Sequence, residues 1–249
     1  MNKCAVILAG GEGKRMKSDI PKPMNEVLGK PMLRWVIDAV REAGVNNICV
    51  VTGFKKEVTE EYLKSLPFPV ETVYQYERLG TGHAVMMAEE FLKRQGGDVV
   101  ILCGDAPFMD ADTIRDAYKQ HDATDCSATV ISAMLDDPTG YGRIVRNADN
   151  TLKCIVEHKE ADEKTRAVKE VNSGGYWFDV ADLLSVLNDI TANNSAKEYY
   201  LPDALDLLLK ADKKVGAFTA KSADTVLGAN DPQQLEELNR IAVQKGYAS

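Results

Sequence analysis

Short apolar segments alternate with amphipathic segments along the first half of this 249-residue chain. Apolar runs with the length of β-strands lie at 3–9, 47–52, 70–76 and 98–103. Between these runs, apolar residues recur at steps of three and four, the spacing that places side chains on one face of a helix. The predicted helix faces comprise Met32, Val36, Ile37 and Val40, then Val58, Tyr62 and Leu66, then Ala84, Met87, Ala88 and Phe91.

This alternation predicts an α/β fold: a mixed, mostly parallel sheet with helices on both faces. The third helix is expected to begin with Thr81 as its N-cap. In such sheets, ligands bind beyond the carboxyl ends of the strands. The glycine-rich loop 10–13, Gln75 and Asp105 each lie at the carboxyl end of a different predicted strand. The sequence therefore predicts one cleft to which all three contribute.

The second half of the chain has a different rhythm, with short strands separated by polar turns. Strands are expected at 126–133, 142–146, 151–158, 170–178 and 213–219, and helices at 180–187, 202–210 and 232–244. Asp149-Asn150 has the composition of a hairpin turn. No internal repeat, low-complexity tract or linker-like stretch interrupts the sequence, so we expect a single domain over residues 1–249.

Composition and charge narrow the class of protein. The formal net charge of −8 argues against non-specific binding to nucleic acid, although a local cationic pocket can still hold a small anion. No apolar run approaches the roughly 20 residues that cross a bilayer, and charged residues follow the first strand where a signal peptide would be apolar. The five cysteines contain no Cys-x-x-Cys pair, and we expect reduced thiols in a cytoplasmic protein.

Residues 8–24, Leu-Ala-Gly-Gly-Glu-Gly-Lys-Arg-Met-Lys-Ser-Asp-Ile-Pro-Lys-Pro-Met, indicate most about function. Glycines let backbone N–H groups approach an anion, and Arg15 and Lys22 can neutralise its charge. A P-loop would need Ser or Thr where Arg15 stands, and a dinucleotide fingerprint would need Gly where Met16 stands. An ordinary turn is the alternative, but the two cations and the rigid Pro-Lys-Pro favour phosphate binding.

Two further strand ends carry candidate chemistry. A carboxylate such as Asp105 can hold Mg²⁺ and leave other positions to water and phosphate; the alternative is a cap for the following turn. The Gln75 amide both donates and accepts hydrogen bonds, which suits the edge of a nucleobase; a solvated side chain is the alternative. The segment 80–82 leaves room for a planar group or forms a plain turn. The remaining candidates lack metal-ligand spacing and are predicted to be structural or exposed: His83, His121 and His158.

Taken together, these motifs resemble those of the sugar-phosphate nucleotidyltransferase family. The signature loop is 8–16, followed by Pro21-Lys22. The branch that the chain resembles most is the bacterial UDP-N-acetylglucosamine pyrophosphorylase domain of a bifunctional uridyltransferase/acetyltransferase. Supporting motifs follow in order over essentially the whole chain, at 29–33, 79–84, 104–107, 138–146, 155–159 and 197–201.

The resemblance implies a role for each matching residue. The catalytic cations that hold the phosphates would be Arg15 and Lys22. Nucleotide contacts would come from Leu8, Gly10, Gly11, Gly13, Gln75, Gly80 and Thr81. The sugar phosphate would lie against Gly142, Glu157, Asn172 and Tyr200. Mg²⁺, the expected cofactor, would bind Asp105 and Asn230.

The resemblance also implies a Rossmann-like nucleotide-diphospho-sugar transferase fold. Residues 1–125 would bind the nucleotide, residues 126–230 would bind the sugar phosphate, and a helix would occupy 231–249. The expected reaction transfers a uridylyl group from UTP to N-acetylglucosamine 1-phosphate and releases pyrophosphate. Gly10, Ser173-Gly174 and Pro202 depart from the branch's usual residues, so the same reaction with another sugar 1-phosphate or with dTTP is the alternative. A non-catalytic nucleotide-sugar-binding protein is an alternative from another class.

The expected partners are small molecules, UTP and a sugar 1-phosphate, with no nucleic acid and no membrane. The hexapeptide repeats of the fused acetyltransferase do not occur in this sequence. We therefore expect the second activity to be missing and the chain to be a monomer or a weak dimer.

Overall fold

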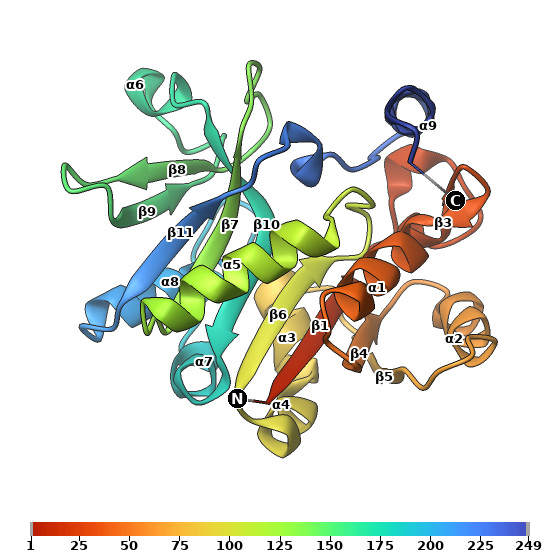
Figure 1. The fold of residues 1–249 in the computed structure, drawn as a ribbon, viewed down its shortest axis with the longest axis horizontal. Coiled ribbons are helices and arrows are strands. Elements are labelled where there is room, and N and C mark those ends of the chain that lie inside the picture. The colour runs from red at the N-terminus through yellow and green to blue at the C-terminus, as the bar shows by residue number, and fades with distance from the viewer. Residues whose placement is uncertain (1, 248–249) are drawn as a thin grey trace.

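A nine-stranded sheet forms the centre of the computed structural model, which describes residues 2–247. Its main path is β11 (Val215–Thr219), β7 (Ala128–Met134), β10 (Glu170–Asp179), β6 (Asp98–Cys103), β1 (Lys3–Ala9), β4 (Asn47–Thr52) and β5 (Glu71–Tyr74) (Figure 1). Along this path β10 runs antiparallel to β6 and β7, and the other pairs are parallel. The predicted mixed, mostly parallel sheet is confirmed. An antiparallel pair, β8 (Arg143–Arg146) and β9 (Leu152–Val156), extends it beside β10.

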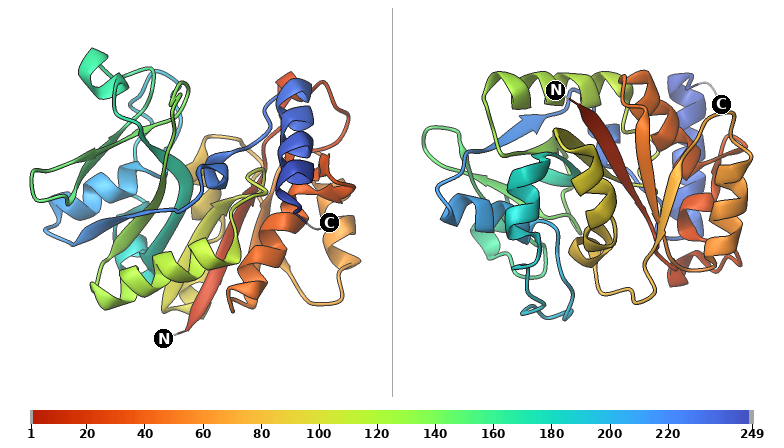
Figure 2. Two further views of the ribbon diagram at one scale, coloured as in Figure 1. Left: turned by 45° about the horizontal axis from the view of Figure 1, so that its top comes forward. Right: turned by 90° about the horizontal axis from the view of Figure 1, so that it is seen from below.

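Helices cover both faces of the sheet (Figure 2, right). One face carries α1 (Met32–Glu42), α2 (Lys56–Lys64) and α5 (Ala111–Ala123), and the other carries α3 (Thr81–Met87), α4 (Glu89–Gln95), α7 (Val180–Leu187) and α8 (Asp203–Lys210). Successive side chains of a strand point to opposite faces. In β1, Cys4 and Val6 join one core while Ala5 and Ile7 join the other, and all four are fully buried. This two-sided burial makes the strand read as an unbroken apolar run.

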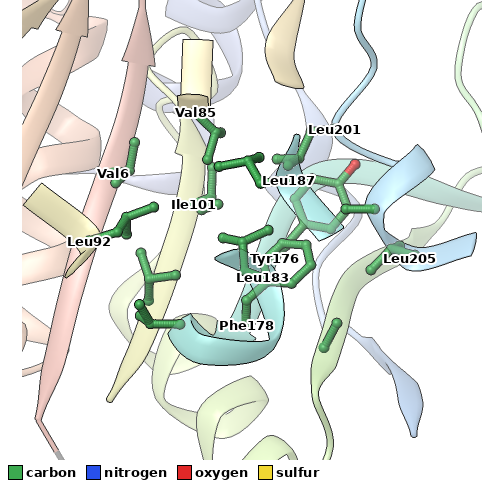
Figure 3. Packing of buried hydrophobic residues seen from close by; sticks show 14 of the residues in the cluster. Val6, Val85, Leu92, Ile101, Tyr176, Phe178, Leu183, Leu187, Leu201 and Leu205 are labelled. Carbon is green, nitrogen blue, oxygen red and sulfur yellow. The ribbon is translucent and has the colours of Figure 1, made fainter. Parts of the chain in front are cut away.

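Apolar side chains of the central strands pack closely against α7 (Figure 3). Tyr176 and Phe178 of β10 pack among Leu183 and Leu187 of α7, and none of these is more than 2% exposed. Burying such a side chain stabilises the fold by about 1.5–3 kcal/mol relative to leaving it exposed. The strand ends beyond this core are therefore well-defined positions for functional residues.

The third predicted helix differs from the structure in two respects. It is divided at Ala88 into α3 and α4, and its N-cap is Gly80 rather than Thr81. Gly80 adopts a φ of 110° and Thr81 is already the first helical residue. The Thr81 hydroxyl oxygen accepts a hydrogen bond from the backbone N–H of Leu201 at 3.0 Å. The prediction of Thr81 as N-cap is wrong because a tertiary contact uses the side chain that would have capped the helix.

Helix α5 was not predicted, because polar residues interrupt its apolar face. Asp110 caps it by accepting from the backbone N–H of Thr113 at 2.8 Å. Several short elements also carry no periodic signal: β2 (Glu26–Val27), β3 (Lys30–Pro31), α6 (Glu163–Arg166) and the 3-10 turns η1 (Lys14–Met16), η2 (Lys22–Met24) and η3 (Ala223–Val226). The other predicted elements occur, with strand ends shifted by one or two residues. Leu66 lies beyond the second predicted helix, which ends at Lys64. The last helix ends at Lys245 rather than at 249, and residues 248–249 lie outside the described residues. At the predicted turn, Asn150 has a φ of 67°.

Helix α9 (Pro232–Lys245) returns to the N-terminal part of the chain, beside β3 in Figure 1. Its Leu238 and Ala242 are buried with Met16, Met32 and Phe108 in a third apolar cluster. This packing brings the residues that precede α9 next to the glycine-rich loop. Among residues 2–247, none of the helices is both long and apolar enough to cross a bilayer.

Candidate active site

The glycine-rich loop follows β1 and folds back on Lys22. Gly13 has a φ of 65°, in the left-handed region that favours glycine. A Cβ at Gly13 would lie 2.8 Å from the Cβ of Lys22, so the loop and the lysine are in close contact. The segment that follows β4 holds the other side of the loop. A Cβ at Gly53 would lie 2.4 Å from the carbonyl oxygen of Gly10, and Phe54 N–H donates to that oxygen at 3.1 Å.

Lys22, Asp105 and Asn230 meet beyond the carboxyl end of the sheet. The Lys22 Nζ donates to the Oδ1 of Asn230 at 2.7 Å and forms an ion pair with the Asp105 carboxylate. Both charged side chains are mostly shielded from water, with exposed fractions of 15% for Lys22 and 26% for Asp105. Lys22 comes from η2, Asp105 follows β6, and Asn230 precedes α9.

A helix cap orients Asn230. The Asp231 carboxylate accepts from the backbone N–H of Gln234 at 2.9 Å, and Gln234 Oε1 accepts from the backbone N–H of Asn230 at 2.7 Å. This reciprocal pattern resembles a capping box. Gly228 brings the same segment against Asp105, since a Cβ there would lie 2.8 Å from the Asp105 carbonyl oxygen.

The donor set fits a magnesium ion. Asp105 supplies a carboxylate and Asn230 an amide oxygen, and both already contact one cationic group, the Lys22 ammonium. Mg²⁺ prefers oxygen ligands and keeps positions for water and substrate phosphates. Within the described part of the chain, no group of three or more His, Cys, Asp and Glu side chains could hold a metal ion. A metal held by Asp105 and Asn230 would therefore need further ligands from a bound nucleotide and water.

Two cavities open beside this junction. The first, about 320 Å³, is lined by most of the residues predicted to bind nucleotide: Leu8, Gly10, Gly11, Gln75, Gly80 and Thr81. The second, about 420 Å³, extends from Arg15 and Asn230 to Tyr141 and Ser173. Lys22, Cys103 and Asp105 line both cavities. The lysine–aspartate pair therefore lies where the two cavities meet, and each cavity has a volume typical of a small-molecule site.

Gln75 lines the first cavity, and its amide is held in place by neighbouring residues. It is 5% exposed, its Nε2 donates to the Gly80 carbonyl oxygen at 3.0 Å, and the same atom lies 3.1 Å from Nδ1 of His83. A Cβ at Gly10 would lie 3.0 Å from Gln75 Oε1. His83 thus has a structural contact, as predicted. Gly80 is needed because a Cβ there would lie 2.5 Å from the carbonyl oxygen of Tyr199.

The residues predicted to bind the sugar phosphate also lie together. Asn172 N–H donates to the Gly142 carbonyl oxygen at 2.9 Å, and a Cβ at Gly142 would lie 3.1 Å from Glu157 Oε1. Burial raises the pKa of Glu157, with Glu160 and Asp203 adding to the effect. Tyr200 lines the first cavity, whereas Gly142, Glu157 and Asn172 line neither cavity.

Several cavity residues were not predicted from the sequence. Tyr141, Ser173 and Gln234 line the second cavity. Tyr141 lies in the motif 138–146 and Ser173 directly follows Asn172, whereas the signal for Gln234 is the Asp231-x-x-Gln234 cap pattern. Arg78 lines the first cavity and pairs with Glu12 of the glycine-rich loop at 3.1 Å. Cys103 stands at the junction, where burial first and Asp105 second raise its pKa to about 12.

This fold and this site define a nucleotidyltransferase. The chain belongs to the nucleotidyl transferase family, whose model matches residues 4–226. It is 45% identical over 237 residues to the bifunctional protein GlmU of Acetivibrio thermocellus, covering 95% of this chain and 51% of that protein. It is 46% identical over 241 residues to the bifunctional protein GlmU of Clostridium beijerinckii, covering 97% of this chain and 52% of that protein. The chain thus spans about half the length of the curated relatives it matches.

Solved structures share the fold at low identity. A crystal structure of apo UDP-glucose pyrophosphorylase superimposes with a TM-score of 0.82 at 18% identity, covering 99% of this chain and 100% of that one. UDP-glucose pyrophosphorylase complexed with UDP-glucose gives a TM-score of 0.81 at 20% identity, covering 98% and 100%. The Rossmann-like fold predicted from the sequence is confirmed.

Proposed function

We propose that this chain transfers a uridylyl group from UTP to N-acetylglucosamine 1-phosphate, giving UDP-N-acetylglucosamine and pyrophosphate. The observation that carries the proposal is the meeting of Lys22, Asp105 and Asn230 between two cavities. Such a junction can bind the phosphates of one substrate beside the phosphate of another. The 45% identity to a bifunctional GlmU protein over 95% of the chain supports this choice of reaction.

In this proposal UTP lies in the first cavity. Gln75 has an amide that can hydrogen-bond to the edge of uracil, and its two neighbours hold that amide in place. Gly10 and Gly11 line the same cavity, and their lack of side chains lets the backbone approach the phosphates. Residues 1–125 would thus bind the nucleotide, while Gly142, Glu157, Asn172 and Tyr200 of the 126–230 segment would bind the sugar phosphate.

The proposed reaction requires no proton transfer by a protein side chain. A phosphate oxygen of the sugar 1-phosphate attacks the α-phosphorus of UTP in line, and pyrophosphate leaves. Because the attacking oxygen is already anionic, no general base is required, and catalysis depends on positioning and charge stabilisation. Lys22 would lie beside the α-phosphate, and Arg15, exposed in the second cavity, would stabilise the leaving pyrophosphate.

Asp105 and Asn230 would hold Mg²⁺ in this reaction. When bound, the ion supplies charge neutralisation and a template for the phosphates of both substrates. The protein's own contribution is the fixed direction of the two oxygen ligands. The helix cap sets the Asn230 backbone, and close packing against Gly228 sets the Asp105 backbone. We place the activity in the cytoplasm, where the five free cysteines stay reduced.

Pyrophosphate release across a panel of sugar 1-phosphates and nucleoside triphosphates, with Mg²⁺, tests the proposal. We expect the highest turnover with UTP and N-acetylglucosamine 1-phosphate, and a loss of about 10²–10³ in rate for Lys22→Ala. A clear preference for another sugar 1-phosphate or for dTTP would replace the substrate assignment. Tight binding of a nucleotide sugar without release from any pair would instead identify a binding protein.

A further inference from the structure

In the proposed sugar site, Asn172 contacts a tyrosine of its own strand. The Nδ2 of Asn172 lies 2.7 Å from the hydroxyl oxygen of Tyr176. Residues four positions apart in a regular strand are separated by about 13 Å, so this contact requires an interruption of β10. The pairing of β10 with β7 shifts between Asn172 and Gly175, leaving Ser173 and Gly174 unpaired, and Gly174 adopts a φ of 77°. The bulge therefore brings the two side chains together.

The bulge also defines which end of the Asn172 amide faces Tyr176. The backbone N–H of Gly174 donates to Asn172 Oδ1 at 3.0 Å. A backbone N–H can only donate, so the atom beside it is the amide oxygen and the atom beside Tyr176 is the amide nitrogen. The tyrosine oxygen accepts that second bond. One N–H and one oxygen lone pair of Asn172 remain for a ligand.

The bulge is fastened to both neighbouring strands. The Ser173 hydroxyl donates to the Ile131 carbonyl oxygen of β7 at 2.7 Å and accepts from Gly175 N–H at 3.0 Å. The Cys103 thiol, at the end of β6, donates to the Gly174 carbonyl oxygen at 3.7 Å. The Asn172 amide is thus tied to the same strand end that carries Asp105.

Tyr176 can affect a ligand through Asn172 but cannot contact one directly. It is 2% exposed, and its ring is enclosed by the core that Figure 3 shows. Burial raises the pKa of Tyr176, so its phenol stays protonated at neutral pH. The core fixes the ring, and the hydroxyl at the end of the ring is a fixed acceptor for Asn172.

We propose that Tyr176 is a positioning residue for the sugar phosphate, because its hydroxyl accepts a hydrogen bond from the Asn172 amide and so fixes the orientation in which that amide binds the sugar. This proposal rests on the proposed function, since it takes Asn172 as a sugar ligand. It adds a determinant of sugar binding that lies beneath the site and lines neither cavity.

A double-mutant cycle on product binding tests the proposal. The variants are Tyr176→Phe, which keeps the ring, Asn172→Ala, and the two combined. Isothermal titration with Mg²⁺ measures the Kd of UDP-N-acetylglucosamine and of UDP, so that the difference reports the sugar. We expect Tyr176→Phe to weaken UDP-N-acetylglucosamine binding about 3–10-fold, the effect of one hydrogen bond, and to leave the Kd of UDP within about twofold. With Asn172→Ala present, Tyr176→Phe should change neither Kd further.

The matched control is Tyr118→Phe. The Tyr118 hydroxyl donates to Asp98 Oδ2 at 3.1 Å, at the start of β6 and hence at the opposite end from Asp105. Tyr118→Phe should leave the dissociation constants of UDP and of UDP-N-acetylglucosamine unchanged.

Three results would overturn the role of Tyr176. In the first, Tyr176→Phe weakens the binding of UDP and of UDP-N-acetylglucosamine equally. In the second, Tyr176→Phe weakens UDP-N-acetylglucosamine binding as much in the Asn172→Ala variant as in the wild type. In the third, Tyr176→Phe changes neither dissociation constant. Failure of the proposed function has a different signature, since a protein that binds the nucleotide sugar without releasing pyrophosphate still permits the cycle.

Discussion

The Nζ of Lys22 lies 2.7 Å from the Oδ1 of Asn230 and forms an ion pair with Asp105. The ammonium group therefore occupies the position between the two residues that we assign to Mg²⁺. Two unit charges of the same sign at 4 Å repel by about 4 kcal/mol at an effective dielectric constant of 20, and a divalent ion would be repelled more strongly. Without a triphosphate to draw Lys22 away, the lysine and the metal compete.

Lys22→Met should therefore bind Mn²⁺, as a probe for Mg²⁺, at least about tenfold more tightly than the wild type when no nucleotide is present. Electron paramagnetic resonance of free Mn²⁺ gives the Kd directly. Arg15→Met is the matched control, because Arg15 lines the cavity but does not contact Asp105 or Asn230 in the structure. Equal Mn²⁺ affinity in the wild type and in Lys22→Met would show that the lysine does not compete with the metal ion for Asp105 and Asn230.

Asp105→Asn should lower the rate of pyrophosphate release by about 10²–10³ while leaving the fold intact. The substitution keeps the shape of the side chain but removes the charge that pairs with Lys22 and that we assign to the metal. Turnover at saturating Mg²⁺ measures the loss, and circular dichroism checks the fold. The exposed Asp137→Asn serves as the control for removing one negative charge. Near-full turnover of Asp105→Asn would remove Asp105 from the reaction.

Gly53→Ala should destabilise the protein by about 1–3 kcal/mol, the usual cost of forcing an extra methyl into packed space. The added Cβ would lie 2.4 Å from the carbonyl oxygen of Gly10, a backbone atom that cannot move aside without moving the glycine-rich loop. Urea unfolding gives the change in free energy. For comparison, Gly11→Ala places its Cβ in open space and should unfold at nearly the wild-type urea concentration. Equal midpoints for the two variants would contradict the packing argument.

Glu170 should make stability depend on pH below neutrality. Burial alone would raise the pKa of this carboxyl, but bonds from Arg146, Ser132 and Thr219 outweigh burial and lower the pKa below 4.5. A pKa lowered on folding means that the unfolded chain binds more protons, so this stabilisation is complete above about pH 4.5. It is lost as the pH falls through the folded-state pKa.

Glu170→Gln should be about 2 kcal/mol less stable at pH 7, because charge-assisted hydrogen bonds from Arg146 at 2.6 and 2.8 Å are weakened. Its free energy of unfolding should also fall less steeply between pH 5 and pH 3 than that of the wild type. Thermal unfolding over this pH range provides the comparison, with the exposed Glu163→Gln as control. Parallel pH profiles for wild type and Glu170→Gln would exclude this pair as a source of acid sensitivity.

Burial explains how much of the fold the sequence predicts. Cys4, Val6, Ala5 and Ile7 are buried on both faces of the sheet, so β1 is visible as an apolar run, and the same holds for β4 and β6. Thr81 shows the limit of local rules, because its hydroxyl bonds to a backbone group 120 positions away. Capping preferences describe a helix in isolation and take no account of such a contact.

In the candidate site, too, some features can be predicted from the local sequence and others cannot. The glycine-rich loop is recognisable locally, since its glycines, its two cations and the Pro-Lys-Pro segment favour phosphate binding over an ordinary turn. The meeting of Lys22 with Asn230, 208 positions apart, has no local signal. The family resemblance paired Asn230 with Asp105 and did not pair it with Lys22. The hydrogen bond between Asn172 and Tyr176 depends on the bulge in β10. Gly174 is the local sequence feature of that bulge, but a glycine in a strand can also mark a bend or a close approach of another backbone, so it does not predict the bond.

A crystal structure with UDP-N-acetylglucosamine and Mg²⁺ tests the central claim most directly. The account predicts uracil beside Gln75 in the first cavity, phosphates at Lys22, a metal ion on Asp105 and Asn230, and the sugar against Asn172 and Glu157. Nucleotide bound away from the Lys22–Asp105 junction, or a metal ion held by other residues, would contradict it.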